Sequence, residues 1–206
     1  MRAGRDAVAL DRDQVVDAAW HILQTYGLGD LSMRRLAREL GVQPGALYWH
    51  VANKQELLAV LAQRMVAPLS MSSTGASPAG ACLTSPSPAG ASSVDAPPAH
   101  ASPAGAADDA VLLITRFRSA VLAVRDGADV VSVAHALDPS GMQPTPLLTA
   151  ALTRAGMDPA PAETAALTLV RFTLGSVTAQ QTRESMDLPT ATMAAEFEAG
   201  VRAILA

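Results

Sequence analysis

Apolar residues recur at helical spacing along two parts of the chain, which are separated by a long stretch of small residues. The first stripe predicts a helix over residues 12–26. Asp11 precedes this helix and Gln14 follows three residues later, which is the spacing of a capping box. Gly27 is suited to end it. The apolar face of the predicted helix consists of Val15, Ala18, Ala19, Ile22, Leu23 and Tyr26.

Two short helices joined by a tight turn are predicted next. Ser32 is a good N-cap for the first of them. Gly41 supplies the left-handed residue that a sharp exit from this helix needs. Pro44 suits the first position of the following helix, because its missing N–H costs nothing there. This order of elements predicts a helix-turn-helix.

A fourth helix is predicted to start at a second capping box, Asn53 and Glu56, and to end at Pro68. The composition then changes. Of the 38 residues in 70–107, 30 are Ala, Ser, Pro or Gly, and Ser-Pro-Ala-Gly-Ala occurs three times. Such a segment buries too little apolar surface to offset its ordering entropy, so we expect a disordered loop. Docking of a protein partner is the alternative interpretation of this segment.

The helical pattern returns over residues 108–126, and further helices are predicted near 146–155, over 161–185 and over 190–205. The last two helices carry apolar stripes: Leu167, Val170, Leu174 and Val177 on one, and Met193, Phe197, Val201 and Ile204 on the other. The two stripes are suited to pair with each other and with a second copy of the chain in a four-helix interface. The pattern as a whole predicts an all-α protein.

Composition agrees with a helical fold inside a cell. Half of the 206 residues are apolar and 3% are aromatic, which favours a core of Ala, Leu and Val. No apolar run reaches the about 18 residues of a membrane helix, and the polar N-terminus does not resemble a secretion signal. The lone Cys82 fits a reducing compartment. We therefore expect a cytoplasmic protein with no membrane partner.

Charge is unevenly distributed along the chain. Residues 1–64 carry eight Lys or Arg and seven Asp or Glu, whereas residues 65–206 carry seven basic and twelve acidic residues. A near-neutral first part with its bases in one motif, joined to an acidic second part, fits a DNA-binding domain with a separate regulatory domain.

Three consecutive residues after the predicted turn bear most directly on function. Tyr48, Trp49 and His50 stand in a row, so they cannot all face one core. Exposed aromatic and polar groups near arginines predict a surface that contacts DNA. Packing of Trp49 against the first helix and a plain surface role for His50 are the alternatives.

Six strings carry a resemblance to a known family. They are DQVVDAA (13–19), MRRLARELG (33–41), LYWHVANK (47–54), VRDGA (124–128), FTLG (172–175) and QQ (180–181). Through them the chain resembles the tetracycline repressor (TetR) family of transcriptional regulators, in its second part as well as its first. The resemblance covers most of the chain outside 70–107.

This resemblance implies an all-α organisation in four segments. They are an N-terminal three-helix helix-turn-helix DNA-binding domain over 1–55, a connecting helix over 56–69, the loop 70–107, and a C-terminal helical ligand-binding and dimerisation domain over 108–206. It also implies a homodimer that binds a palindromic operator in double-stranded DNA.

The DNA-binding residues follow from the resemblance and from the way such motifs dock, with the start of the second helix against base edges. They are Arg34, Gln43, Pro44, Gly45, Ala46, Tyr48, Trp49, His50 and Lys54. Arg34 matches the family's guanine-reading arginine, and Tyr48, His50 and Lys54 would hold phosphates. Pro-Gly-Ala stands where tetracycline repressors carry Gln-Pro-Thr, so a different operator sequence is expected.

The expected ligand-binding residues are Leu113, Phe117, Val131, His135, Leu148 and Thr178. The resemblance matches Leu113, Phe117 and Val131 to pocket positions of the family, and His135 is a polar group near them. Val131 and Ala179 occupy the positions of the family's magnesium-site histidine and glutamate, and neither side chain can ligate Mg²⁺. We therefore expect an apolar pocket with no metal and no cofactor. His135 would orient the ligand, with a structural role as the alternative.

The expected function is that of a repressor released by a small hydrophobic effector, such as an antibiotic or another natural product. The alternative keeps DNA binding but replaces the small molecule with a protein partner. An enzyme is not expected, because the chain contains no Gly-rich phosphate loop, no metal-ligand cluster and no nucleophile turn.

Overall fold

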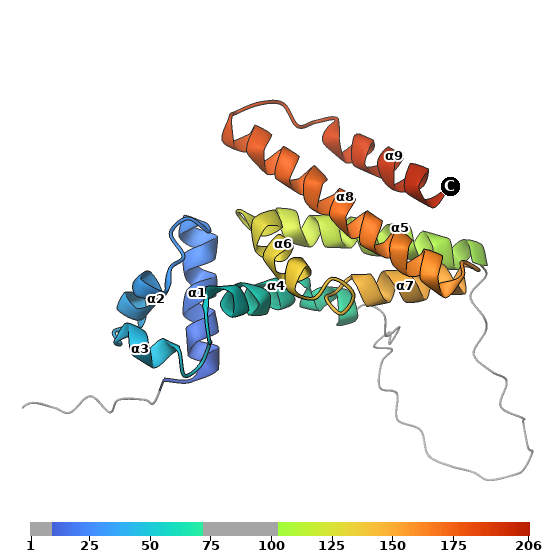
Figure 1. The fold of residues 1–206 in the computed structure, drawn as a ribbon. Helices are drawn as coiled ribbons and strands as arrows, with labels where there is room; N and C mark the ends of the chain where they lie inside the picture. Colours follow the sequence, from blue (N-terminus) through green and yellow to red (C-terminus); the bar gives the residue numbers. More distant parts are fainter. Residues whose placement is uncertain (1–9, 72–102) are drawn as a thin grey trace, which may run out of the picture.

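The computed structural model describes residues 10–71 and 103–206, and within these ranges the chain is helical and contains no strand. This confirms the all-α fold. A small head lies to one side of a larger body, as Figure 1 shows. The head consists of α1 (Arg12–Tyr26), α2 (Met33–Leu40) and α3 (Pro44–Leu47). Helix α4 (Lys54–Met71) runs from the head into the body, which contains α5 (Pro103–Leu122), α6 (Gly127–Leu137), α7 (Thr145–Arg154), α8 (Pro159–Ser185) and α9 (Met193–Leu205).

The local signals in the head act as the sequence predicts. The Asp11 carboxylate accepts a hydrogen bond from the Gln14 N–H at 2.7 Å, and the Gln14 side-chain oxygen accepts one from the Asp11 N–H at 3.2 Å. Gly27 ends α1 with a φ of 84°. The Ser32 hydroxyl accepts the Arg35 N–H at 3.2 Å and so caps α2. These caps satisfy backbone groups that a helix end would otherwise leave unpaired.

Helix α4 departs from the sequence prediction at both ends. The Asn53 side chain caps it by accepting the Glu56 N–H at 2.8 Å, but the Glu56 carboxylate accepts the Ala52 N–H at 2.7 Å, one residue before the expected partner. Pro68 does not end the helix, which continues to Met71. Leu69, just beyond the proline, is only 5% exposed, and this burial offsets the hydrogen bond that the proline cannot donate.

The predicted loop 70–107 is helical at its two ends, because α5 already starts at Pro103. Ala106 is fully buried, so packing extends the helix beyond the apolar stripe visible in the sequence. The rest of that predicted loop, 72–102, lies outside the described residues. Helix α6 was not expected from the sequence, where Asp126 and Gly127 look like a break. In the structure Asp126 takes the left-handed conformation, with a φ of 56°, and the next helix starts immediately.

One continuous apolar core extends from the head through α4 into the body. A polar contact joins the two parts at the turn after α1: the Asp126 carboxylate accepts the Leu28 N–H at 2.8 Å. This contact requires glycine at position 27, because a Cβ there would lie 2.6 Å from the Asp126 Oδ2 atom. The end of α1 is therefore tied to the start of α6.

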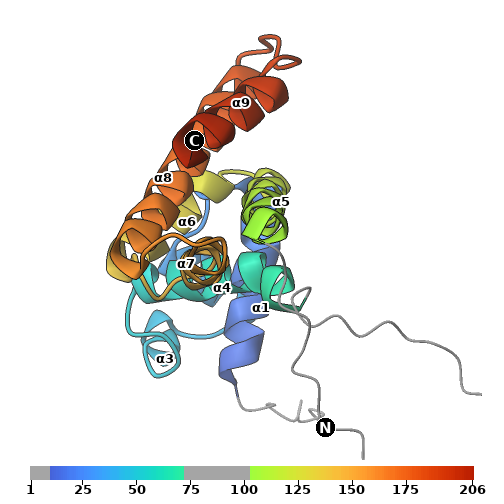
Figure 2. The ribbon, with the colours of Figure 1, turned by 90° about the vertical axis from the view of Figure 1, so that its right-hand side faces the viewer.

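Helices α8 and α9 form one edge of the body and lie side by side in Figure 2. The Phe172 and Phe197 rings stack between them, with centroids 5.6 Å apart. The Arg118 guanidinium, from α5, lies 5.0 Å from the Phe197 ring centroid and donates a hydrogen bond to the Gln180 side chain. The Gln181 amide donates to the Val124 carbonyl at 2.8 Å. The two glutamines therefore fix α8 to α5.

Most of the two apolar stripes on α8 and α9 is buried within the same chain. The buried members are Val170, Leu174, Val177, Phe197 and Val201. The prediction that a second copy of the chain packs against these stripes is therefore wrong for these five residues. The outward face of α8 carries small and polar side chains instead: Thr164, Thr168, Arg171, Gly175, Thr178 and Thr182.

Candidate nucleic-acid interface

The turn between α2 and α3 sets the geometry of the head. Gly41 has a φ of 67°, and its N–H donates to the Ala37 and Arg38 carbonyls. The Val42 N–H also donates to the Ala37 carbonyl, at 2.9 Å. Pro44 then occupies the first position of α3. This hydrogen-bonded exit is the C-terminal motif that glycine allows, and it turns the chain sharply between the two helices.

The aromatic residues lie just beyond α3 rather than within it. Helix α3 ends at Leu47, and Tyr48, Trp49 and His50 form the turn that follows. Leu47 and Val51 are 0% and 1% exposed and hold this turn against the core of the head. The second helix of the helix-turn-helix therefore ends before the three residues, which belong to the turn that follows it.

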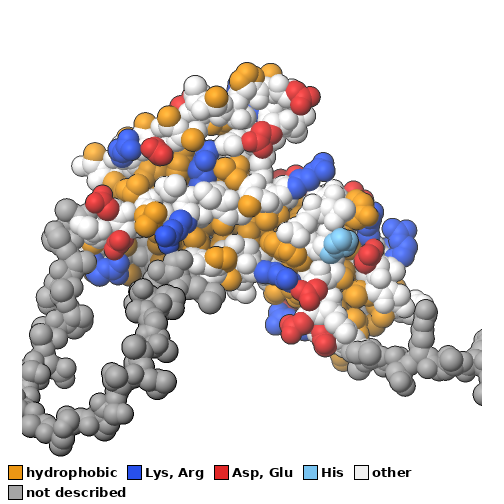
Figure 3. Space-filling view, turned by 180° about the vertical axis from the view of Figure 1, so that it is seen from behind, with side chains coloured by type: hydrophobic (Ala, Val, Ile, Leu, Met, Phe, Trp, Pro, Cys, Tyr) orange, Lys and Arg blue, Asp and Glu red, His pale blue; other side chains and the backbone are white. Residues whose placement is uncertain are grey.

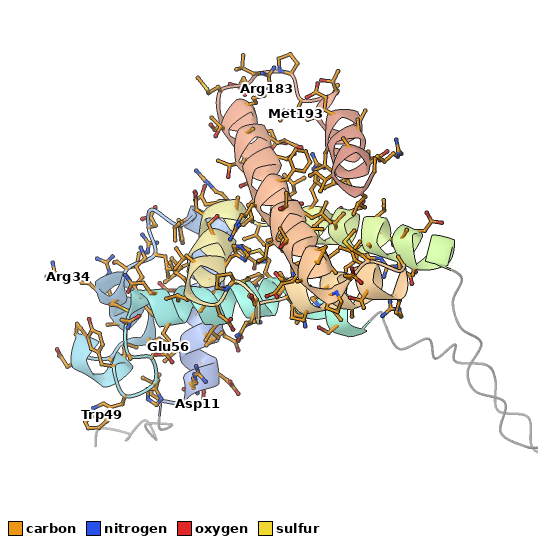
Figure 4. The ribbon with its side chains drawn as sticks, turned by 45° about the vertical axis from the view of Figure 1, so that its right-hand side comes forward. Asp11, Arg34, Trp49, Glu56, Arg183 and Met193 are labelled. Carbon is orange, nitrogen blue, oxygen red and sulfur yellow. The ribbon has the colours of Figure 1, made fainter. Side chains whose placement is uncertain are left out.

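The most exposed aromatic side chains of the head belong to this turn. Trp49 is 90% exposed and Tyr48 is 52% exposed, which removes the alternative that Trp49 packs against α1. His50 is partly buried. In Figure 4, Trp49 and Arg34 both lie at the outer edge of the head, away from the body. Tyr48 and Trp49 are exposed next to each other, and adjoining exposed aromatic side chains indicate a contact surface for a partner.

Two neighbouring arginines at the start of α2 have different surroundings. The Arg35 guanidinium pairs with the Asp30 carboxylate at 2.9 Å and lies 4.2 Å from the Tyr26 ring centroid. Arg34 is exposed and forms no ion pair with any residue that the structure describes. Of these two arginines, Arg34 is therefore the one whose charge is not paired with a described residue. It is also the arginine that the family resemblance identifies as the base reader.

The remaining predicted DNA-binding residues surround the start of α3. Gln43, Pro44 and Gly45 are exposed, and Ala46 and Lys54 are partly buried. A Cβ built on Gly45 would meet no atom within 4 Å, so the surface there is open. The Glu56 carboxylate links this region to α1 through Arg12, with 3.3 Å between the charged atoms. The head thus presents one rigid exposed surface containing aromatic groups, polar groups and a free arginine.

The six predicted ligand-binding residues fall into two groups. Phe117, Val131 and Leu148 are fully buried in the core of the body, and Leu113 is partly buried. His135 and Thr178 instead lie in a surface hollow between α6 and α8, with a volume of about 460 Å³.

The other residues of this hollow were not expected from the sequence. They are Ser132, Ala136, Pro139, Arg171, Leu174 and Gly175. On each of α6 and α8, lining residues stand three and four positions after the first of them, at Ser132 and at Arg171, which puts them on one face of the helix. That spacing is the signal that could have found them, once α6 itself was recognised.

Two kinds of feature are absent from the residues that the structure describes, the head included. Within residues 10–71 and 103–206, no group of three or more His, Cys, Asp or Glu side chains could hold a metal ion. In the same ranges no helix has both the length and the apolar character needed to cross a bilayer. Seen from behind, the surface carries scattered charges of both signs with apolar side chains among them (Figure 3).

Comparison with known proteins places both parts of the chain in one family. Residues 15–61 match the family model of bacterial regulatory proteins of the tetR family, and residues 105–205 match the model of the tetracyclin repressor-like C-terminal domain. The tetracycline repressor protein class D of Escherichia coli is 45% identical over 58 residues. That match spans 28% of this chain and 27% of the repressor, so it concerns the head and little else.

Two solved structures resemble the whole chain. BioQ with its double-stranded DNA operator has 30% sequence identity and a TM-score of 0.66, and the match covers 95% of this chain and 96% of BioQ. A TetR variant from Acinetobacter baumannii AYE in complex with minocycline has 27% identity and a TM-score of 0.66. That match covers 95% of this chain and 94% of the other.

Proposed function

Because the chain belongs to the tetR family of bacterial regulatory proteins, we propose that it is a cytoplasmic transcriptional repressor. It binds a palindromic operator in double-stranded DNA as a homodimer, and a small molecule bound in the body releases it. The observation that carries the proposal is the head surface, where a tryptophan that is 90% exposed and an arginine without an ion pair among the described residues both lie at the outer edge of the helix-turn-helix.

The DNA-binding half of the proposal assigns a contact to each part of that surface. Arg34 reads a guanine through two parallel hydrogen bonds, a contact worth about 1–3 kcal/mol of discrimination. Gln43, Pro44, Gly45 and Ala46 face base edges in the major groove. Tyr48, Trp49, His50 and Lys54 contact the backbone and fix the register. The complex of BioQ with its operator supports this assignment.

The dimer uses exposed residues of α9 and of the first half of α8, and it leaves open the hollow between α6 and α8. On the first half of α8 these residues include Thr164 and Thr168, whose small side chains allow a second helix to approach closely. A second hollow, of about 630 Å³, lies between the start of α8 and the end of α9 and is lined by apolar side chains and threonines. Closed two-fold pairing through this edge would place two heads on the same side of the molecule. Their recognition helices must lie about 34 Å apart to reach successive major grooves.

The effector acts by favouring a state in which the two heads are wrongly spaced. The path from the body to the head is short, because α6 contacts the hollow and its first turn holds the Leu28 N–H through Asp126. The complex of a family member with minocycline supports small-molecule control. Val131 is fully buried and Ala179 is exposed, and neither side chain supplies a donor for magnesium. Effector release is therefore independent of Mg²⁺.

The test is selection of DNA from a random double-stranded library by the purified full chain, followed by measurement of affinity. We expect the selected sequences to form an inverted repeat. Replacing Arg34 by alanine should weaken binding to the best site about 5–150-fold, the equivalent of 1–3 kcal/mol. Arg116→Ala, which removes an exposed arginine of α5 in the body, should have no effect. Equal loss in both variants would contradict the assignment of Arg34.

Magnesium dependence tests the effector half separately. If tetracycline released the operator only in the presence of Mg²⁺, the argument from Val131 and Ala179 would fail.

The alternative to a small-molecule effector is control of DNA binding by a protein partner. Deleting residues 75–105, which include most of the segment considered for docking, would then abolish regulation. Under the small-molecule proposal this deletion leaves DNA binding and release nearly unchanged.

A further inference from the structure

The hollow between α6 and α8 has the size and lining of a small-molecule site. Its volume of about 460 Å³ falls within the range of about 300–1,000 Å³ that is usual for such sites. Ala136, Pro139 and Leu174 supply apolar surface. Ser132, His135, Arg171 and Thr178 supply polar groups around it.

The polar groups of the hollow are unbalanced in charge. Arg171 is the one residue of the lining with a permanent positive charge, and no aspartate or glutamate lines the hollow. Arg171 is exposed and forms no ion pair with a residue that the structure describes. Five other arginines do pair with a carboxylate: Arg12, Arg35, Arg64, Arg154 and Arg202. The charge of Arg171 is therefore not neutralised by a carboxylate of the residues that the structure describes.

His135 lies beside this cation and has an unmet hydrogen-bonding group. The side chain is only 7% exposed, and its Nε2 atom has no hydrogen-bond partner. Burial, and secondly the charge of Arg171, lower the pKa of His135 below its usual value. The imidazole is therefore neutral near pH 7, and the positive charge that faces the hollow belongs to Arg171 alone. A buried polar atom without a partner is uncommon and calls for an explanation such as a ligand.

We propose that this hollow binds an organic anion, namely an apolar molecule with one carboxylate. The carboxylate pairs with the Arg171 guanidinium, whose planar fork matches it with two parallel hydrogen bonds. The apolar part of the molecule covers Pro139 and Leu174. This inference deepens the proposed function, on which it rests for the role of the ligand as effector. It narrows the small hydrophobic effector expected from the sequence to one that carries an acidic group.

A pair of probes that differ only in charge tests the class of ligand. Calorimetry on the full chain would compare 1-naphthoate with 1-naphthamide, which has nearly the same shape but no charge. We expect the naphthoate to bind at least about tenfold more tightly, a difference of 1.4 kcal/mol. Arg171→Gln should remove this preference, Arg171→Lys should keep part of it, and the matched control Arg116→Gln should keep all of it.

Two further readouts separate ligand binding from a structural role of Arg171. In an NMR titration, naphthoate should raise the pKa of His135, because the carboxylate offsets the neighbouring positive charge. In the Arg171→Gln variant the same probe should leave that pKa unchanged. The molar mass from light scattering should be the same for both proteins. A lower mass for Arg171→Gln would assign Arg171 to contacts between copies and overturn the proposal.

Equal binding of the two probes, absence of binding, or an unchanged preference in Arg171→Gln would each overturn the anion site. These outcomes are independent of the proposed function, because operator binding is measured without any probe. Failure to select an operator would contradict DNA binding and leave the calorimetric result standing.

Discussion

Removing the Asp126 side chain is expected to loosen the head from the body. Its carboxylate accepts the Leu28 N–H at 2.8 Å in a partly buried site, across 98 positions of sequence. A hydrogen bond to a charged group contributes about 1.5–3 kcal/mol. Asp126 also has a φ of 56°, a conformation that costs most side chains about 1–2 kcal/mol.

These two terms can be separated by three substitutions. Asp126→Gly loses the hydrogen bond and relieves little strain, because aspartate itself tolerates the left-handed conformation, so the free energy of unfolding should fall by about 1.5–3 kcal/mol. Asp126→Ala loses the bond and keeps the unfavourable backbone, so it should cost about 1–2 kcal/mol more than glycine. Asp126→Asn retains an oxygen acceptor and tolerates the left-handed conformation, so it should be the mildest of the three.

Urea unfolding followed by circular dichroism measures the three free energies, and amide hydrogen exchange measures the contact itself. Exchange at the Leu28 N–H should accelerate in the glycine and alanine variants and much less in the asparagine variant. Gly27→Ala approaches the same contact from the other side, because its Cβ would lie 2.6 Å from the Asp126 Oδ2 atom. Part of its cost should vanish in combination with Asp126→Gly, where that atom is absent.

Two results would refute this reasoning. If Asp126→Gly were as stable as the natural chain and exchange at Leu28 were unchanged, the contact would not join the head to the body. If the alanine and glycine variants were equally stable, the backbone conformation would carry no cost.

Three other substitutions test separate parts of the structure. Gly200→Ala would place a Cβ 2.3 Å from the Cζ atom of Phe172 and so displace that ring from its stack on Phe197. The free energy of unfolding, measured in urea, should fall by about 1–3 kcal/mol. Gly45→Asn should leave the melting temperature within about 2 °C, because a Cβ there meets no atom within 4 Å, yet DNA selection should give a different base at one position of each half-site. Burial, and secondly a neighbouring arginine, lower the pKa of His135 from 6.5. The unfolded chain therefore takes up a proton that the folded chain resists, and stability present above about pH 6.5 is lost as the pH falls. His135→Gln should flatten this loss between about pH 7 and pH 5 in unfolding measured at each pH.

The features that the sequence predicts well are those determined by residues close together in the chain. The bounds of α1, the capping of α2 by Ser32 and the left-handed exit at Gly41 all depend on side chains within four positions. Exposure of Trp49 was also predictable, because three bulky residues in a row cannot share one core.

The failures concern residues whose conformation depends on distant contacts. Pro68 lies inside a helix because burial of the following turn offsets the lost hydrogen bond. Asp126 looks like a helix break, yet its left-handed conformation starts α6 at once and is stabilised by a contact with the head. Neither effect can be read from local propensity.

The candidate ligand site was predictable only in part for the same reason. Of the expected ligand-binding residues, His135 and Thr178 line the hollow, whereas Phe117, Val131 and Leu148 are fully buried. Arg171 belongs to no motif, and it becomes a site residue only because α6 packs beside α8.

The most direct test of two-fold operator binding is a change in the spacing of the two half-sites. Once an inverted repeat has been selected, five base pairs are inserted at its centre, which rotates one half-site by about half a turn of the roughly 10-base-pair helix. Two heads held by one dimer cannot then reach both half-sites, so the affinity of the full chain, measured by fluorescence anisotropy, should fall to that of a single half-site. Undiminished affinity for the lengthened site would contradict the dimeric reader.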